Sequence, residues 1–324
     1  MNFWKDLKKP IMILAPMYGV TDTCFRQIVA SVGRPDIFFT EFTPVEGLLS
    51  PAKEKFLETL KFTGVERPIV AQIWGANPEK FYQAAKLISK LGFDGIDINM
   101  GCPEKNPVKT GSCAALIKNP ELAKEIILAT IKGGNGLPVS VKTRIGFGKI
   151  ETEEWVRILL GTPITALTLH LRTAKEESQV PAHWEEMKKA VEVRRQLGSK
   201  ALLIGNGDIK SLKEAEEKCQ QFEIDGVMIG RGIFENVWFF NPNVDLKKIT
   251  PKMKIDLLLK HLELFQKTYG NHRHFELMKK FVKCYVNNFK GATEARKKLM
   301  ATKSLNELIE ATTQLSVDQA NERI

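Results

Sequence analysis

The chain of 324 residues has few cysteines, no long apolar run and no recognisable metal-ligand pattern. Its five cysteines, at positions 24, 102, 113, 219 and 284, form no CxxC pair, so neither a zinc site nor a disulfide scaffold is expected. No apolar run approaches the roughly 18 residues that a membrane span needs, and the first residues, MNFWKDLKKP, contain no apolar signal region. Scattered thiols in such a chain are typical of a reducing compartment. We therefore expect a cytoplasmic protein that contacts no membrane and holds no metal.

What the chain has in excess is positive charge, and this charge is unevenly spread. The formal net charge is +10, from 48 Lys and Arg against 38 Asp and Glu. Residues 241–324 alone contain 16 basic against 9 acidic residues. This asymmetry indicates a polyanionic partner, although a solvated basic surface would give the same composition.

Along residues 11–232, short apolar runs alternate with longer amphipathic ones. Eight strands are predicted, at residues 11–16, 37–42, 68–75, 95–101, 138–146, 166–172, 201–207 and 226–232. Two of the intervening runs, 77–92 and 119–134, begin with Asn-Pro and end in glycine, as capped helices do. Eight strand–helix units with nearly continuous apolar strands favour a TIM (β/α)8 barrel. A doubly wound open sheet is the alternative, but no GxGxxG motif follows the first strand.

The repeating pattern ends near residue 250, and the rest of the sequence is helical in character. The stretch NPNVDLKKITP at residues 241–251 contains two prolines and marks the expected boundary. We predict an α/β TIM-barrel domain over residues 1–242 and a small all-α helical domain over residues 250–324. Nothing in the sequence requires more than a monomer.

Polar side chains occur at the C-terminal ends of most predicted strands, where a TIM barrel has its active site. They are Glu41, Gln72, Asn99, Cys102, Lys142, Arg144, His170, Arg172, Asn206 and Arg231. The last two predicted strands run into the glycine turns IGNGDIKS and IGRGIF, and each turn leads into a helix. Glycine lets backbone N–H groups approach a phosphate, and Arg231 adds a charge. We expect a phosphate site at these two turns.

Two further strand residues extend this site. Lys142 lies within a strand, where an ammonium group needs an anion, a Schiff-base partner or a salt bridge, for example to Glu41. Gln72 is a two-sided hydrogen-bonding group that suits the edge of a heterocycle. A phosphate site, a cation and an amide at one end of a barrel predict a phosphorylated, ring-bearing cofactor.

Several motifs together resemble those of the tRNA-dihydrouridine synthases. They are APMYGVTD at 15–22, INMGCPEKNPVKTGSCAALI at 98–117, VKTRIG at 141–146, HLRT at 170–173, GNGD at 205–208 and GRG at 230–232, with the strand around Gln72. The tail stretch LMKKFVKCYVNNFKGATEARKKL is similar to the RNA-binding helices of that family. The resemblance implies a barrel that binds FMN and uses NADPH to reduce particular uridines of tRNA to 5,6-dihydrouridine.

The resemblance also implies roles for individual residues. Those that match the flavin site are Pro16, Met17, Tyr18, Gln72, Lys142, His170, Asn206, Gly207, Asp208, Gly230 and Arg231. Cys102 matches the catalytic acid, and we expect Asn99, Arg144 and Arg172 to contact the substrate. Three positions depart from the family pattern: Leu171 stands where glycine is common, Phe281 where histidine is frequent, and Cys113 where a small residue is usual. We interpret Cys113 as a packing residue.

Cys102 lies in a Gly-Cys-Pro turn, and this setting suits an acid. Reduction of the uracil C5=C6 bond needs a hydride at C6, which reduced flavin supplies, and a proton at C5. A neutral thiol with a pKa near ~8.5 keeps its proton at neutral pH. Gly101 permits a sharp exit from the strand, Pro103 fixes the backbone after the cysteine, and Asn99 can contact the uracil edge. An isolated cysteine would more often be a small buried hydrophobe.

In the tail, apolar and basic residues separate onto different sides of a predicted helix. Leu277, Phe281, Cys284 and Tyr285 recur at helical spacing and should pack inward. Lys279, Lys280 and Lys283 then lie together on the other side and, with Lys290 and residues 296–298, predict a phosphate-binding strip for tRNA.

Two other functions fit parts of the sequence. An FMN barrel oxidoreductase of a small pyrimidine, similar to a dihydroorotate dehydrogenase, would share the flavin chemistry but would not need the basic tail. A non-catalytic RNA-binding barrel would need the tail but no flavin.

Overall fold

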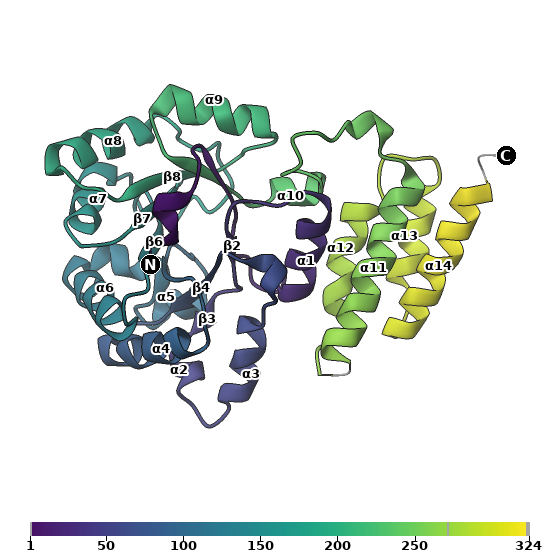
Figure 1. The fold of residues 1–324 in the computed structure, drawn as a ribbon, viewed down its shortest axis with the longest axis horizontal. Coiled ribbons are helices and arrows are strands. Elements are labelled where there is room, and N and C mark those ends of the chain that lie inside the picture. The colour runs from purple at the N-terminus through teal and green to yellow at the C-terminus, as the bar shows by residue number, and fades with distance from the viewer. Residues whose placement is uncertain (1, 271, 322–324) are drawn as a thin grey trace. The chain divides into compact units, whose positions relative to one another are not determined.

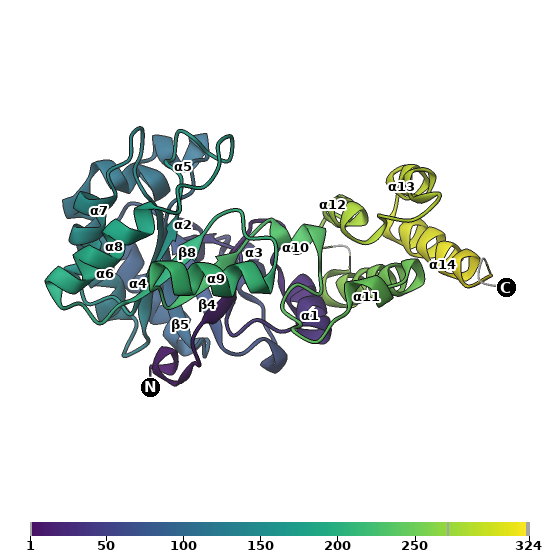
Figure 2. The same ribbon diagram turned by 90° about the horizontal axis from the view of Figure 1, so that it is seen from above.

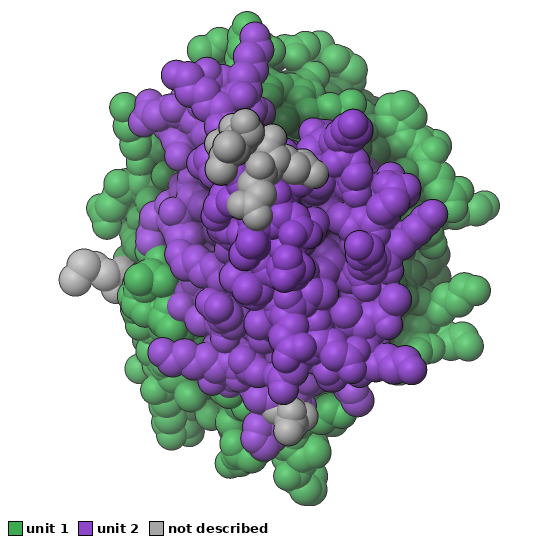
Figure 3. Space-filling view, turned by 90° about the vertical axis from the view of Figure 1, so that its right-hand side faces the viewer, with its two compact units in different colours: residues 1–23, 35–230 green, residues 24–34, 231–324 purple. Residues whose placement is uncertain are grey.

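The computed structural model describes residues 2–270 and 272–321 (Figure 1). The predicted domain ranges begin at residue 1 and end at residue 324, and these ends, with residues 271, 322 and 323, lie outside the described residues. The chain divides into two compact units, coloured separately in Figure 3. The first unit comprises residues 1–23 and 35–230, and the second comprises residues 24–34 and 231–324.

A parallel sheet of nine strands forms the first unit. The strands are β1 (Ile11–Leu14), β2 (Phe38–Phe39), β3 (Thr43–Pro44), β4 (Ile69–Trp74), β5 (Gly95–Met100), β6 (Val139–Arg144), β7 (Ala166–His170), β8 (Leu202–Asn206) and β9 (Gly226–Ile229). Their order is β1-β9-β8-β7-β6-β5-β4-β2, and the short β3 also pairs with β4. Each predicted strand therefore appears, and β3 is an addition that the sequence pattern did not indicate.

The first and last strands of this order meet, which makes the sheet a nearly closed barrel. The N–H of Leu14 donates to the carbonyl of Ile37 at 3.3 Å, and the N–H of Asp36 donates to that of Met12 at 2.8 Å. An isolated parallel bridge joins Ile13 and Ile37. The predicted TIM barrel is thus confirmed over the open doubly wound sheet.

Helices cover the outside of this barrel (Figures 1 and 2). They are α2 (Val45–Leu48), α4 (Pro78–Lys90), α6 (Pro120–Gly133), α7 (Thr152–Leu160), α8 (Glu186–Leu197) and α9 (Leu212–Phe222). The short helices α3 (Lys53–Leu57) and α5 (Lys105–Lys109) bury no residue and belong to connecting segments. The two Asn-Pro signals act as predicted, because the side chains of Asn77 and Asn119 accept hydrogen bonds from the N–H groups of Lys80 and Leu122. The described part of this unit also contains the short 3-10 helices η1 (Phe3–Asp6), η2 (Glu58–Leu60), η3 (Gly64–Glu66) and η4 (Cys113–Lys118).

The interior of the barrel changes from apolar to polar along the strands. A buried cluster at the N-terminal side contains Trp4, Ile11, Ile13, Val70, Ala166, Ile204 and Met228. Side chains two residues further along a strand point to the same face. Gln72 therefore follows Val70 on the inner face, and Asn206 follows Ile204. This alternation brings polar side chains to the C-terminal end above an apolar floor.

The second unit is helical and has its own core. Its helices are α1 (Thr23–Val32), whose first residue belongs to the barrel unit, α10 (Gly232–Glu235), α11 (Pro251–Tyr269), α12 (Glu276–Tyr285), α13 (Ala292–Met300) and α14 (Leu305–Asn321), with the 3-10 helix η5 (Leu246–Lys248). The ring of Phe281 lies 4.9 Å from that of Phe25 and 4.7 Å from that of His261. Phe281 thus serves as a core aromatic residue at the position where the resemblance suggested histidine.

The predicted inward face of α12 is largely confirmed. Phe281, Cys284 and Tyr285 are buried, whereas Leu277 is only half-buried. Among the helices of residues 2–270 and 272–321, none combines the length and the apolar character that crossing a bilayer requires.

Candidate functional site

Four side chains form a hydrogen-bonded network inside the C-terminal end of the barrel. The amide nitrogen of Asn99 donates to Gln72 Oε1 at 3.0 Å, and Gln72 Nε2 donates to Asp97 Oδ2 at 2.7 Å. The Ser140 hydroxyl donates to the second carboxylate oxygen of Asp97 at 2.5 Å. All four side chains are buried. The structure therefore brings the predicted residues Gln72 and Asn99 together.

Asp97 and Ser140 were not among the predicted site residues. A signal for Asp97 was present, because it precedes Asn99 by two positions and so lies on the same face of β5. Burial raises the pKa of Asp97 from 3.8 to about 6, against the lowering effects of the Ser140 and Gln72 hydrogen bonds and of Lys142. The carboxyl group is still mainly ionised at neutral pH.

The turn that carries Cys102 is held from two sides. The side-chain oxygen of Asn99 accepts hydrogen bonds from the backbone N–H groups of Gly101 and Cys102, both at 3.0 Å. Arg144 Nε donates to the carbonyl of Gly101 at 2.8 Å. Cys102 itself is partly exposed at the end of β5.

A second cysteine lies beside this turn. The N–H of Ala114 donates to the carbonyl of Cys102 at 3.2 Å, which brings the preceding residue, Cys113, close to it. Cys113 is buried and has a left-handed backbone with φ of 55°. Its thiol hydrogen-bonds to that of Cys102, so Cys113 is more than the packing residue that the sequence indicated.

The thiol–thiol hydrogen bond changes the acidity of both groups. It is the largest cause that lowers the pKa of Cys102 from 9.0 to about 7, while burial acts in the opposite direction. The same hydrogen bond and burial raise the pKa of Cys113. The Cys102 thiol is therefore more acidic than an ordinary thiol.

Lys142 and Asn206 form a second polar pair in the barrel. Lys142 Nζ donates to Asn206 Oδ1 at 3.1 Å, and Asn206 Nδ2 donates to the carbonyl of Met228 at 2.7 Å. Burial, with a smaller effect of Arg144, lowers the pKa of Lys142 to about 8. His170 is the register partner of both Arg144 and Asn206. The sequence suggested Glu41 as a salt-bridge partner for Lys142, and the observed hydrogen bond goes to Asn206 instead.

The two glycine turns differ in their surroundings. Gly207 has a φ of +140°, and an added Cβ would lie 2.7 Å from the Cβ of Ala182, so packing alone requires glycine here. At Gly230 a Cβ would meet only the Cβ of Ala15, at 3.9 Å. The backbone at Gly230 is therefore open to the close approach of a ligand.

Asp208 and the two predicted substrate arginines brace the loops around the site. Asp208 has a φ of 56° and accepts hydrogen bonds from Arg172 and from the N–H of Ala182. Arg172 is only 2% exposed. Arg144 donates to the carbonyls of Thr173 and Glu177 at 2.9 Å. These contacts are structural, and a contact of either arginine with RNA stays a prediction.

The segment after β1 is held in place by short hydrogen bonds. The N–H of Met17 donates to Thr21 Oγ1 at 2.8 Å, and the N–H of Gly19 donates to Glu41 Oε1 at 2.6 Å. Pro16 is buried, whereas Tyr18 is 67% exposed, with its ring 5.6 Å from that of Phe42. Tyr18 thus offers an exposed aromatic surface next to a fixed backbone.

The helical unit contains a basic groove between α12 and α13, with a volume of about 440 Å³. Its charged lining residues are Lys279, Lys280, Lys283, Arg296 and Lys297. Lys279 is only 11% exposed and donates to Glu276 Oε1 at 2.9 Å and to the carbonyl of Thr302 at 2.7 Å. Lys280 and Lys283 are exposed. The three lysines predicted to lie together do so.

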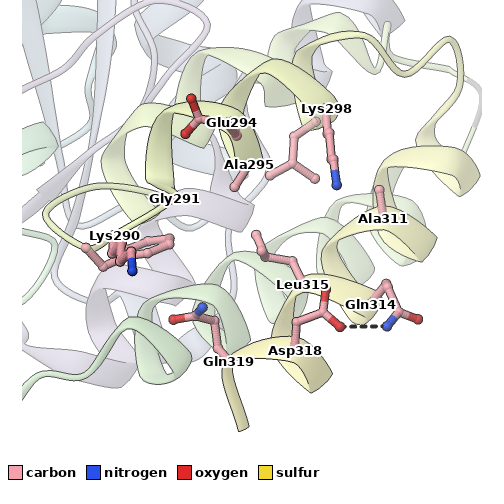
Figure 4. Close-up of a pocket in the computed structure, with 12 residues that line it drawn as sticks. Lys290, Gly291, Glu294, Ala295, Lys298, Ala311, Gln314, Leu315, Asp318 and Gln319 are labelled. Carbon is pink, nitrogen blue, oxygen red and sulfur yellow. Dashed lines mark hydrogen bonds between the residues drawn. The ribbon is translucent and has the colours of Figure 1, made fainter. Parts of the chain in front are cut away.

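A second groove, between α13 and α14, has a mixed lining (Figure 4). Its volume is about 340 Å³, and it is lined by Lys290 and Lys298 together with Glu294 and Asp318. Asp318 accepts a hydrogen bond from Gln314 at 2.9 Å. The predicted strip is therefore divided, because Lys290 and Lys298 belong to a groove in which acidic residues offset their charge.

Comparison with known proteins agrees with these observations. The pattern of the family described as dihydrouridine synthase (Dus) matches residues 13–322. This chain belongs to the dihydrouridine synthase family. It is therefore a member of a family of enzymes, as the sequence motifs indicated.

Relatives of this dihydrouridine synthase family member are similar over nearly their whole length. A probable tRNA-dihydrouridine synthase of Staphylococcus aureus (strain COL) is 44% identical over 309 residues, which cover 94% of this chain and 93% of the relative. Probable tRNA-dihydrouridine synthase 2 of Bacillus subtilis (strain 168) is 42% identical over 310 residues, which cover 95% and 94%.

Solved structures of other proteins share the architecture of this dihydrouridine synthase family member. A structure of 2-naphthoyl-CoA reductase with 2-naphthoyl-CoA has a TM-score of 0.56 and 12% identity, and the match covers 72% of this chain and 49% of that chain. Histamine dehydrogenase from Rhizobium sp. 4-9 has a TM-score of 0.54 at 12% identity, with 78% and 48% covered. At this identity the likeness concerns the fold alone.

Proposed function

We propose that the protein reduces particular uridines of tRNA to 5,6-dihydrouridine, with FMN as cofactor and NADPH as reductant. Family membership and relatives named as probable tRNA-dihydrouridine synthases support the reaction. The observation that carries the proposal is Cys102, a partly exposed residue on a hydrogen-bonded turn at the C-terminal end of the barrel, whose thiol has a pKa of about 7.

The residues at this end of the barrel fit a flavin mononucleotide. Gly230 leaves its backbone open, as a phosphate requires, and Arg231 follows it in the chain with a positive charge. Gly207 and Asp208 form the neighbouring turn. Lys142, mainly protonated at neutral pH, would stabilise negative charge on a bound ring.

The remaining flavin contacts are proposed from the same resemblance. Gln72 has a second amide hydrogen besides the one that it donates to Asp97. The side chain of Asn206 is held by its hydrogen bond to the carbonyl of Met228, and His170 is the register partner of Asn206 on the neighbouring strand. Pro16, Met17 and Tyr18 would contact the ring through a backbone that Thr21 and Glu41 hold. A bound reduced flavin would supply the hydride for C6 of the uracil.

Cys102 is proposed to give the proton to C5. A general acid works best when its pKa is close to the working pH, because it then keeps its proton and still donates it readily. A pKa of about 7 satisfies this condition better than an ordinary thiol pKa would. Asn99 uses its oxygen for the turn and one amide hydrogen for Gln72, so a second amide hydrogen is left to contact the uracil edge.

The basic groove on α12 and α13 is proposed to bind tRNA phosphates. Its charged residues are all basic, and a polyanion binds such a surface with release of counterions. We propose that the predicted domain of residues 1–242, without residues 24–34 and 231–242 of the helical unit, is catalytic, and that residues 250–324 bind tRNA. A cytoplasmic location fits the five scattered cysteines, which form no CxxC pair. One chain provides every residue named here, so a monomer suffices.

The central test separates the two half-reactions. Purified protein should be yellow and should bind one FMN per chain in a titration. Cys102→Ala should oxidise NADPH at nearly the wild-type rate, while reduction of uridine in tRNA slows by about 10²–10⁴-fold, the usual contribution of general acid catalysis. A protein that binds no FMN, or a variant that loses both half-reactions equally, would contradict the proposal. Reduction of a free pyrimidine but not of tRNA would point to a small-molecule oxidoreductase.

The tRNA groove is tested with two matched charge reversals. Lys280→Glu with Lys283→Glu changes the basic groove, and Lys290→Glu with Lys298→Glu makes the same change of net charge at the mixed groove. The first pair should weaken tRNA binding and reduce the slope of log K against log salt by roughly 0.7–0.9 per lost phosphate contact. The second pair should weaken tRNA binding and reduce this slope much less. Equal effects of the two pairs would mean that net charge, rather than this groove, determines binding.

A further inference from the structure

Asp97 is a charged group in the interior of the barrel that the proposed reaction does not use directly. Its carboxylate is fully buried and accepts hydrogen bonds from Gln72 and Ser140. Burial of an ionised carboxylate is costly, and an apolar side chain would fill a barrel interior without that cost. We therefore expect the Asp97 carboxylate to have a specific role, and the direction of its hydrogen bonds indicates this role.

An ionised carboxylate can only accept hydrogen bonds. Gln72 must therefore turn its NH₂ group toward Asp97, which leaves the oxygen of Gln72 facing Asn99. Asn99 must in turn point its NH₂ group at Gln72 and its oxygen at the following turn. That oxygen accepts from the backbone N–H groups of Gly101 and Cys102.

Without a fixed acceptor at position 97, only the two N–H groups of the turn itself would hold this sequence of bonds in its observed direction. The oxygen and nitrogen ends of an amide have nearly the same shape, so the two flipped arrangements pack equally well. In the reversed arrangement the NH₂ group of Asn99 would face the N–H groups of Gly101 and Cys102. Donors would then face donors, and the turn would lose both hydrogen bonds.

We propose that Asp97 is a positioning residue that fixes the turn of Cys102 by setting the orientation of the Gln72 and Asn99 side-chain amides. The importance of this turn for catalysis rests on the function proposed above. The positioning itself is a property of the polypeptide and can be measured without tRNA or NADPH.

The experiment compares three variants by hydrogen exchange of the backbone amides of Gly101 and Cys102, followed in peptides that span residues 99–103. Asp97→Leu keeps a similar shape but removes the acceptor, and it should speed exchange of these two amides by on the order of tenfold. Asp97→Asn can still turn its oxygen toward Gln72 and should keep part of the protection. Ser140→Ala removes a hydrogen bond of the same network but leaves the carboxylate in place, so protection of the turn should stay near wild type.

A purely structural role for Asp97 makes a different prediction. In that case, Ser140→Ala and Asp97→Leu should speed hydrogen exchange to the same extent. The faster exchange should also extend over the backbone amides of β5 and β6 rather than be limited to the turn. To guard against general unfolding, Asp225→Asn provides a control. Asp225 is also a buried carboxylate, and it bonds to Arg194 and to the N–H of Leu203 rather than to this network. This variant should leave the two amides protected.

The pH dependence of Cys102 alkylation gives a second measurement. Release of the turn in Asp97→Leu should move its midpoint upward from about 7, because the hydrogen bond with Cys113 depends on the same turn. Unchanged exchange and an unchanged midpoint in Asp97→Leu would overturn the inference, even in an enzyme that reduces tRNA. Faster exchange in a protein that proves unable to reduce uridine would instead leave the positioning role standing and refute the proposed function.

Discussion

Replacement of Cys113 by alanine should make Cys102 a much weaker acid. The hydrogen bond between the two thiols is the largest cause of the lowered pKa of Cys102, and burial alone would raise that pKa. Alanine is a suitable replacement because it is small and has no hydrogen-bonding group. The left-handed backbone at this position, with φ of 55°, disfavours alanine about as much as cysteine, so the change adds little strain.

The expected effect is a slower reaction of the Cys102 thiol near neutral pH. With a pKa of about 7, half of the Cys102 thiols are ionised at pH 7. With the hydrogen bond removed, burial should raise this pKa, and a smaller fraction of the thiols would be ionised. Because the thiolate is the nucleophile, and a thiolate of higher pKa is more reactive, alkylation of Cys102 at pH 7 should slow by about threefold to tenfold.

The assay is alkylation by iodoacetamide across a pH series, with Cys102 followed by peptide mass spectrometry. The other four cysteines are buried, and burial raises the pKa values of Cys219 and Cys284 to about 12, so they should react slowly. Cys284→Ala serves as the control, since it removes a buried thiol in the helical unit. The basic limb of the pH profile for uridine reduction should move upward together with the alkylation midpoint in Cys113→Ala. An alkylation midpoint that stays near 7 in this variant would refute the role assigned to Cys113.

Three further predictions concern stability and cofactor binding. Burial lowers the pKa of His261 from 6.5 to about 3, so its contribution to stability is complete above pH 6.5 and is lost as the pH falls toward 3. The free energy of unfolding of the wild type should therefore fall by about 2 kcal/mol more than that of His261→Leu between pH 7 and pH 5, as measured by urea titration; parallel pH profiles would contradict this. Gly230→Ala should keep the melting temperature and weaken FMN binding about tenfold or more, because its Cβ would fill space that is otherwise open. Gly207→Ala, whose Cβ would clash with Ala182 at a φ of +140°, should lose about 1–3 kcal/mol of stability, whereas the openly placed Gly148→Ala should be neutral in both assays.

The sequence alone predicted the features that short stretches of chain encode. The barrel strands follow from apolar runs of the right length, and the Asn-Pro starts of α4 and α6 from capping within one turn. The glycine turns after β8 and β9, the Gly-Cys-Pro turn and the inward face of α12 are likewise local. The family followed from ordered motifs along the chain. Each of these signals depends on neighbours within a few residues, so it can be read without knowing the fold.

Tertiary structure alone decided which distant side chains meet. Phe25, from the first helix, packs with His261 and Phe281, and this contact across more than 200 residues groups α1 with the C-terminal helices. Asp97 became a site residue only when the register of β4, β5 and β6 placed it beside Gln72 and Ser140. The acidity of Cys102 likewise depends on a loop that returns Cys113 to its side. Strand register and the path of the loops determine which residues become partners, and both are properties of the whole fold. Hydrogen bonds and burial at those positions then set the charge states on which the proposed chemistry depends.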